Sequence, residues 1–433
     1  MVKKYPYKEI VLPNKLKLLL YPMESVLSVH LVTFVRVGAV YEKEKERGIS
    51  HFTEHMPFLG TKKFQGPLAL SRQELKIGAK DNGWTDRFNT RYFVILPYLN
   101  IAKGIELLYQ LVFKPLLKKS DVEKEKGVIL SEFNDFWHNP DLRFNYETWR
   151  KRFKQKKHPY SYRAVGIPDT INSITQKDIL SWREKYYNPS NMILSIVGKF
   201  DENKTIKIIE NTFAKENAGL KAKEPKFNTK DYSNFLVFRQ KEPRQQIKFF
   251  ISFPAFGRKE ISRTKRIQLH LLNHIFGEGS ASRLFQTLRE KERLVYRIGS
   301  DLHLHTWMGA LEIWGSTPIQ KLLPAMKLIK QEIDKIVEDG VSQKEIKLSR
   351  NYINAITLMR FDNPESITYY FGYQAFDEEE IWFPEDYTRE ANKITKNELD
   401  ELAREIIDYK KVNISLMGNV PQKTLKSVEN IFK

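Results

Sequence analysis

The spacing of apolar and polar residues changes period repeatedly along the chain and predicts alternating strands and helices. A period of two, with branched and aromatic residues, predicts strands at 15–21, 25–37 and 192–197 and an extended strand pair over 82–97. Spacings of three and four residues predict helices at 48–56, 68–77, 101–113, 120–137, 142–154, 175–186 and 204–213. The first half of the chain is therefore expected to be α+β.

The second half repeats the first at a constant distance. Ile174-Thr-Gln-Lys-Asp-Ile-Leu returns as Ile394-Thr-Lys-Asn-Glu-Leu, and Met192-Ile-Leu-Ser-Ile-Val-Gly returns as Val412-Asn-Ile-Ser-Leu-Met-Gly. Both pairs are offset by 220 residues (394−174 and 412−192), which predicts duplication of an α+β unit of roughly 200 residues. Because 215–231 is polar and aperiodic, we expect an N-terminal domain at 1–215, a linker at 216–232 and a C-terminal domain at 233–433.

Composition narrows the possible chemistry. The 433 residues contain no Cys, so disulfides, thiol nucleophiles and Cys-ligated zinc are excluded and a metal would be held by His, Asp or Glu. The net charge of +19 comes from Lys and Arg interleaved with Glu, which is more typical of a solvated surface than of a nucleic-acid-binding patch. The N-terminus has no secretion-signal pattern, and His30 and Arg36 interrupt the longest apolar stretch. We expect a cytoplasmic protein that binds neither nucleic acid nor membrane.

Residues 48–56 carry His51, Glu54 and His55 on a predicted helix. At about 100° per residue, Glu54 lies about 60° from His51 on one side and His55 about 40° on the other, so the three share a face. Two His at positions i and i+4 chelate a tetrahedral zinc ion, and a Glu beside them that is not a ligand can accept a proton from water. This is the inverted H-x-x-E-H motif. The alternative is an amphipathic helix with two partly buried His.

A catalytic zinc ion needs a third protein ligand. The next long predicted helix carries Glu125 and Glu132, which are seven residues or two turns apart and therefore face the same way. Moving the motif by the repeat offset leads, within one residue, to His270 and His274, with Asn273 in place of the Glu. The second copy keeps two His but lacks the base, so we expect no catalytic metal there.

These residues resemble the family of pitrilysin, insulin-degrading enzyme and mitochondrial processing peptidase. That family combines the inverted motif with a Glu ligand some 75 residues further on and another Glu seven positions before that ligand. Here 76 residues separate His55 from Glu132 (132−55−1). The resemblance extends over nearly the whole chain, through Asn82-Gly-Trp-Thr85 with Thr90 and Tyr92, His158-Pro-Tyr160, Gly166, Tyr187-Asn-Pro189, Gly198, Ser282-Arg-Leu-Phe-Gln-Thr-Leu-Arg289 and Tyr296.

The resemblance implies roles for the residues of the first half. His51, His55 and Glu132 would ligate one Zn²⁺ per chain, and Glu54 would be the general base toward the attacking water. Glu125 would orient a ligand His or tune the charge of the site.

A short segment is expected to bind the substrate. Asn82, Gly83, Trp84 and Thr85 correspond to the strand along which this family holds its peptide substrates. The alternative is an ordinary sheet edge without a binding role.

The second half would supply an Arg/Tyr pair. The Tyr296 hydroxyl would donate a hydrogen bond to the oxyanion of the reaction, and Arg289 would hold a carbonyl or carboxylate of the substrate. Arg283 and Arg293 remain alternatives for the Arg role. Since Arg289 and Tyr296 are seven residues apart, they could also lie together on a helix surface without a catalytic role.

The resemblance also implies an architecture. Each domain would be a mostly antiparallel sheet with helices packed on one side, and the chain would form half of a clam-shell chamber. The shorter members work as dimers, so we expect a homodimer in which the Arg/Tyr pair of one subunit completes the zinc site of the other. Two residues depart from the family pattern: Thr53 replaces a usual Leu, and Pro57 should end or kink the helix.

The expected function is that of a zinc endopeptidase that cleaves peptides or short unfolded polypeptides inside a closed chamber. One alternative is a non-catalytic chamber subunit or scaffold of the same fold. Another is a leader-peptide processing peptidase, which is less favoured because a chain of charge +19 repels basic leaders. A third alternative is a nucleic-acid-binding protein, for which the positive net charge is the only support.

Overall fold

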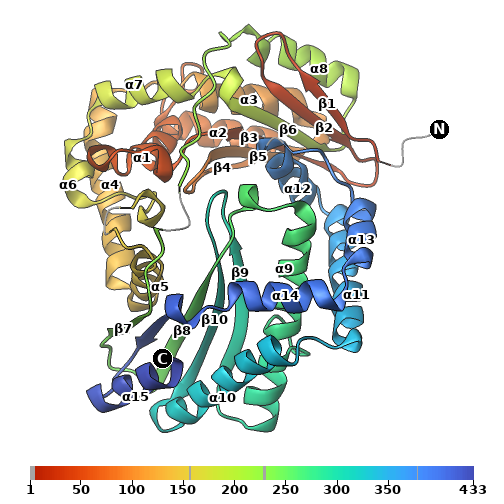
Figure 1. Cartoon of the computed structure of the whole chain (residues 1–433). Helices are drawn as coiled ribbons and strands as arrows, with labels where there is room; N and C mark the ends of the chain where they lie inside the picture. Colours follow the sequence, from red (N-terminus) through yellow and green to blue (C-terminus); the bar gives the residue numbers. More distant parts are fainter. Residues whose placement is uncertain (1–4, 156–157, 228–230, 378) are drawn as a thin grey trace. The chain divides into compact units, whose positions relative to one another are not determined.

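The computed structural model describes residues 5–155, 158–227, 231–377 and 379–433. It contains two compact units, each built around one β-sheet (Figure 1). The first unit consists of the chain up to His138 together with Pro159–Pro225 and Met359–Ile381. The second consists of Asn139–His158, Lys226–Leu358 and Trp382–Lys433. The predicted α+β class with two sheet-plus-helix domains is confirmed.

The first unit holds a six-stranded sheet in the order β1-β2-β6-β3-β5-β4. Among the described strands, β2 and β6 are the parallel neighbours and every other pair is antiparallel, so the sheet is mostly antiparallel as expected. β4 lies at one edge of the sheet, beside β5. The strands are β1 Lys8–Val11, β2 Lys17–Pro22, β3 Ser28–Val35, β4 Lys80–Thr85, β5 Thr90–Pro97 and β6 Met192–Gly198.

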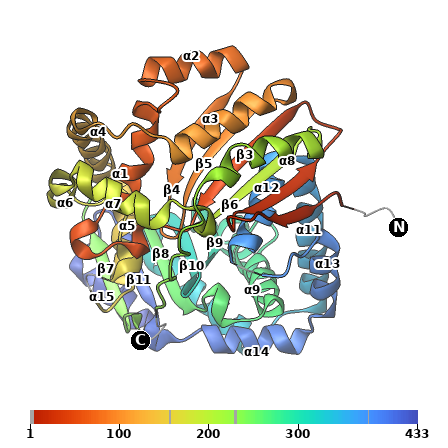
Figure 2. The ribbon, with the colours of Figure 1, turned by 90° about the horizontal axis from the view of Figure 1, so that it is seen from above.

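One face of this sheet carries the main core of the first unit. Val29, Leu31 and Val35 of β3 alternate onto this face and pack with the apolar side of α3 (Ile101–Phe113), which includes Leu107 and Leu111. Figure 2 shows α3 along the strands. The other helices of the first half within this unit are α1 Ile49–His55, α2 Pro67–Ile77, α4 Lys119–His138, α6 Pro168–Ser173, α7 Gln176–Tyr186 and α8 Glu202–Glu210.

The opposite face of the same sheet is also covered, which the one-sided arrangement expected from the sequence did not include. His30, Val32 and Phe34 of β3 point to this face and are buried. They lie under α12 (Pro364–Phe376), a helix of the second half, where the Thr368 hydroxyl is 3.1 Å from His30 Nδ1. Seven of the eight residues of β3 are buried because both of its faces are covered.

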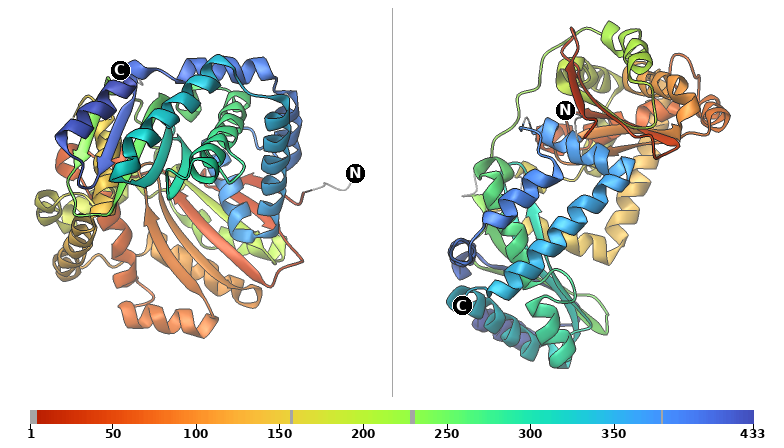
Figure 3. Two further views of the ribbon diagram at one scale, coloured as in Figure 1. Left: turned by 90° about the horizontal axis from the view of Figure 1, so that it is seen from below. Right: turned by 90° about the vertical axis from the view of Figure 1, so that its right-hand side faces the viewer.

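The second unit repeats this topology with a five-stranded sheet in the order β7-β11-β8-β10-β9. The parallel pair β7/β11 corresponds to β2/β6, so the order of the duplicated strands is the same in both sheets. The strands are β7 Leu236–Gln240, β8 Gln246–Ala255, β9 Arg297–Leu304, β10 Gly309–Pro318 and β11 Asn413–Met417. The helices, drawn from green to blue in Figure 3, include α9 Arg263–Phe276, α10 Ile319–Glu338, α11 Gln343–Met359, α13 Pro384–Lys393, α14 Lys396–Ile406 and α15 Gln422–Phe432.

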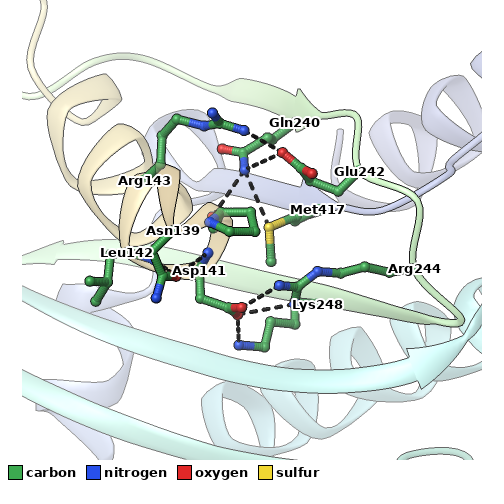
Figure 4. A network of polar contacts seen from close by, with 10 residues as sticks. Asn139, Asp141, Leu142, Arg143, Gln240, Glu242, Arg244, Lys248 and Met417 are labelled. Carbon is green, nitrogen blue, oxygen red and sulfur yellow. Dashed lines mark hydrogen bonds and ion pairs between the residues drawn. The ribbon is translucent and has the colours of Figure 1, made fainter. Parts of the chain in front are cut away.

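A helix of the first half belongs to this second unit. α5 (Pro140–Lys151) begins in a network of polar contacts in which Asp141 accepts hydrogen bonds from Arg244 and Lys248 (Figure 4). Just beyond the end of the helix, Arg152 forms a buried ion pair with Glu312 of β10. Removing one partner of a buried ion pair lowers the stability of a fold by about 3–5 kcal/mol. These contacts therefore hold the segment against the second sheet.

The two halves of the sequence thus exchange one segment each, α5 for α12. The predicted domain boundaries, at residues 215 and 233, refer to the two copies of the sequence repeat. They remain a prediction. In the described part of the chain, no helix is both long and apolar enough to span a membrane.

Candidate metal centre

The first two predicted ligands lie on α1, a short helix with special residues at both ends. Gly48 begins it at φ 95°, a left-handed conformation that favours Gly, where a Cβ would lie 2.9 Å from the Cα of Gly166. The helix gives way to a 3₁₀ turn at Met56–Leu59, which contains Pro57, as the Pro predicts. Phe52 packs into the core, and the two His of the motif lie to one side of it, about 60° (His55) and about 100° (His51) around the helix.

Thr53, the residue that replaces a usual Leu, is fully buried in this helix. Its hydroxyl has no hydrogen-bond partner among the described residues. An unsatisfied buried hydroxyl costs about 1–3 kcal/mol, so Thr53 destabilises this part of the fold relative to an apolar residue.

The structure brings the three predicted ligands together. His51 Nε2 lies 3.2 Å from His55 Nε2, and Glu132 Oε2 on α4 lies 3.7 and 3.8 Å from these two nitrogens. Donors about 2.0–2.2 Å from a tetrahedral zinc ion are about 3.3–3.6 Å apart. The three distances between the donor atoms lie within about 0.2 Å of this range, so small side-chain movements would fit them to zinc. The two His side chains are 17% exposed and Glu132 is 45% exposed, which leaves the centre accessible to solvent and substrate.

Glu125 positions one of these ligands. Its buried carboxylate lies 2.8 Å from His55 Nδ1, so His55 Nδ1–H donates to it and Nε2 is directed toward the donor cluster. Burial alone disfavours the His55 imidazolium, but the hydrogen bond to Glu125 and the charges of Glu54 and Glu132 outweigh it and raise the pKa of His55. A metal binding at Nε2 therefore competes with a proton more than it would at an ordinary His.

His51 is in a different state. Burial, with the positive charges of His55 and Arg163 adding to it, lowers the pKa of His51 to about 3. The imidazole is neutral at pH 7 and offers a lone pair to a metal. Its Nδ1 has no hydrogen-bond partner among the described residues, so His51 lacks an orienting partner of the kind that Glu125 provides for His55.

Glu54 lies beside the donor cluster and is not part of it. Its carboxylate is buried between α1 and β4, and a Cβ added at Gly83 would lie 2.7 Å from its Oε1. Burial raises the pKa of Glu54 to about 7, with a hydrogen bond from Thr85 and the charge of His55 opposing the rise. Oε2 has no partner in the described part of the chain and is free to accept a proton, as a general base must be.

The predicted substrate residues lie on the edge strand β4. Gly83 and Thr85 are buried on the side of α1, whereas Asn82 and Trp84 are exposed on the other side. Sequence reasoning gave Gly83 a place in a substrate strand but missed that it allows the close approach of Glu54. A Gly inside a strand pattern is the signal for such an approach.

Arg289 and Tyr296 belong to the second unit. Arg289 lies on the π-helical segment Phe285–Lys291 and Tyr296 just before β9; both side chains are exposed, Tyr296 by 64%. The rival Arg283 forms a two-pronged ion pair with Glu345, at 2.6 and 2.9 Å, so it is engaged in structure.

The duplicated His pair of the second half has lost the Glu of the motif, and its neighbours are engaged in other contacts. His274 stacks on Tyr352 with ring centroids 4.4 Å apart, and the Asn273 amide bonds Glu278 and Ser300. Among the described residues, the cluster on α1 and α4 is the group of donors that could hold a metal ion.

Family models match most of the chain. The model described as Insulinase (Peptidase family M16) matches residues 23–160, and the one described as Peptidase M16 inactive domain matches residues 173–353. A Rickettsia felis protein named Uncharacterized zinc protease is 31% identical over 350 residues, which are 80% of this chain and 82% of that protein.

Two solved structures share the fold. A protease from Helicobacter pylori superposes with a TM-score of 0.85 at 20% identity, over 96% of this chain and 99% of that one. The periplasmic protease PqqL from Escherichia coli superposes with a TM-score of 0.84 at 18% identity, over 100% of this chain and 50% of that one.

Proposed function

Because this chain belongs to peptidase family M16, we propose that it is a zinc-dependent endopeptidase that hydrolyses peptides or short unfolded polypeptides. The observation that carries the proposal is the spacing of the donor atoms of His51, His55 and Glu132, with the buried carboxylate of Glu54 beside them. The residues present fit one zinc ion, because two neutral imidazoles and one carboxylate are ligands typical of a catalytic zinc site.

The chain's own residues account for the proton transfers of peptide hydrolysis. Zinc would polarise the scissile carbonyl and lower the pKa of water. Glu54 takes a proton from the attacking water at its free Oε2 and then delivers it to the leaving amine. The hydrogen bond from His55 to Glu125 keeps the ligand ring in place during these steps.

The peptide would bind as an additional strand along β4. An edge strand offers unpaired N–H and C=O groups that bind any extended peptide through its main chain. Because Gly83 touches Glu54, a peptide on this edge brings its backbone close to the base. This explains how one site can serve many sequences.

Incubation with a mixed peptide library, with and without a chelator, tests the proposal. Mass spectrometry should detect internal cleavage that disappears with the chelator and returns when zinc is added, because the three ligands leave a position open for water. The purified protein should contain about one zinc ion per chain. A metal-free protein that cleaves nothing would instead be a scaffold of the same fold.

We further propose that the enzyme is a homodimer that works in the cytoplasm, with Arg289 and Tyr296 supplied to the zinc site by the partner subunit inside a closed chamber. The superposition of this chain on half of the Escherichia coli chain supports the pairing, since one long chain can take the place of two short ones. That protein is described as periplasmic, so cell fractionation is the direct test of the compartment.

Mixing two inactive variants tests the shared site. Glu54→Gln and Tyr296→Phe dimers, each nearly inactive alone, should after subunit exchange recover about one quarter of wild-type activity, because half of the dimers are mixed and each has one intact site. Mixing Glu54→Gln with Glu132→Gln is the control and should recover nothing, since both changes affect the zinc half. No recovery with Tyr296→Phe would mean that Tyr296 acts within its own chain, and a Tyr296→Phe dimer that is fully active alone would mean that Tyr296 has no role.

A further inference from the structure

The edge strand β4 presents two faces to a bound peptide. Successive side chains of a strand point to opposite sides, and those of an added peptide follow the same alternation. Gly83 and Thr85 point toward Glu54, and Lys80, Asn82 and Trp84 point to the other face of the sheet. Every second side chain of the peptide therefore meets a surface that takes no part in the chemistry.

Arg91 of β5 dominates that second face. It pairs directly with Trp84 of β4, and its guanidinium carbon is 6.0 Å from the centre of the Trp84 ring. On the other side it is 5.3 Å from the ring of Tyr369 on α12 and donates a 2.7 Å hydrogen bond to the hydroxyl of Tyr373. These rings and this bond hold a side chain that would otherwise be mobile.

Arg91 lies on β5, one strand in from the peptide edge, and Trp84 of β4 is its neighbour on the side of that edge. Its side chain is 13% exposed, and Trp84 next to it is 58% exposed. The ion-pair partner of Arg91 among the described residues is Asp86, whose Oδ2 lies 3.9 Å from Arg91 Nη2. Asp86 is already committed to the turn between β4 and β5, where Oδ1 accepts hydrogen bonds from the backbone of Phe88 and Asn89.

All charged residues of β4 and β5 on this face are positive. Alternation places Lys80 and Arg91 there, whereas Asp81 lies on the opposite face with Gly83. A carboxylate on a peptide strand would thus meet Arg91 and the exposed ring of Trp84 at one position, with Lys80 about 13 Å further along the strand. The net charge of +19 acts in the same direction at long range.

We infer that Trp84 and Arg91 form a subsite that selects an Asp or Glu side chain of the peptide lying on β4. The inference rests on the proposed function, because it takes β4 as the strand that holds the substrate. The alternation of a strand confines the acidic preference to one substrate position or to positions two residues apart.

Peptides of one sequence, in which each position in turn is Glu, Gln or Lys, test the subsite with the zinc-loaded full-length protein. The wild type should favour Glu over Gln about tenfold in kcat/KM at one position, or at two positions separated by one residue, and should disfavour Lys there. In Arg91→Gln this ratio should fall to about one. In Arg91→Lys it should fall only partly, because the charge remains but the two-pronged geometry is lost.

Arg72→Gln is the matched control, since Arg72 is an exposed residue of α2 in the same unit and should leave the ratio unchanged. Binding of labelled Glu and Gln peptides to the zinc-loaded Glu54→Gln variant gives a second readout that needs no hydrolysis. Metal-dependent cleavage without acidic preference, or with a preference that survives in Arg91→Gln, would overturn the subsite and leave the peptidase intact. Acid-selective binding that requires Arg91, without cleavage by the wild type, would support the subsite and overturn the peptidase.

Discussion

Glu54→Gln is expected to leave zinc bound and to lower kcat by about 10²–10⁴-fold. Glu54 lies outside the three-donor cluster, so the change removes no ligand. Gln has nearly the same shape and keeps the contact with Gly83, but its amide cannot take a proton from water. Zinc content by elemental analysis and kcat on a cleaved library peptide measure the two effects separately.

Glu54→Asp provides the control for position. It keeps a carboxylate but draws it back from the centre by one methylene, so its kcat should lie between those of the wild type and Glu54→Gln. Unaltered cleavage by zinc-loaded Glu54→Gln would show that another group is the base. Loss of zinc from Glu54→Gln would show that Glu54 holds the metal.

Glu132→Gln is expected to lose both zinc and activity. Glu132 supplies the carboxylate donor, 3.7 and 3.8 Å from the two His nitrogens, and its charge compensates that of the metal. Removing an outer partner of a ligand costs about 10–100-fold in metal affinity, so removing the ligand itself should cost more than about 100-fold. Competition with a chromogenic chelator measures this affinity, and added zinc should restore part of the activity.

Glu123→Gln is the matched control for this loss. Glu123 lies on the same helix, α4, where it is exposed and paired with Lys126, so its replacement should change zinc affinity and activity little. Equal zinc affinity in Glu132→Gln and wild type would exclude Glu132 as a zinc ligand. The two His would then be the only ligands left of the proposed three.

Local patterns were sufficient to predict most elements of the fold. Helix α3 falls on the predicted residues 101–113, and β6 within one residue of 192–197, because each carries a long periodic signal. The repeat at an offset of 220 residues predicted the shared topology of the two sheets. The exchange of α5 and α12 was not predictable, because an amphipathic helix does not specify which sheet it covers.

Some residues of the candidate site were likewise predictable from the sequence, and others were placed only by the structure. His51, Glu54 and His55 follow from helix geometry, since four residues make one turn. Glu125 and Glu132 share a helical face in the sequence, and only the resemblance, through the 76 residues between His55 and Glu132, implied which of them meets the metal. The structure gives them different positions. Glu125 accepts a hydrogen bond from Nδ1 of His55, and Glu132 lies on the side of Nε2, within the donor cluster.

By itself the sequence determined the α+β class, the duplication and the motif on α1, because periodicity and spacing are local properties of a chain. The tertiary structure decided what depends on contacts between distant segments. It put α4 beside α1 to complete the donor set, Gly83 against Glu54, and α12 behind Arg91. Such contacts result from packing, which joins residues that no local pattern relates.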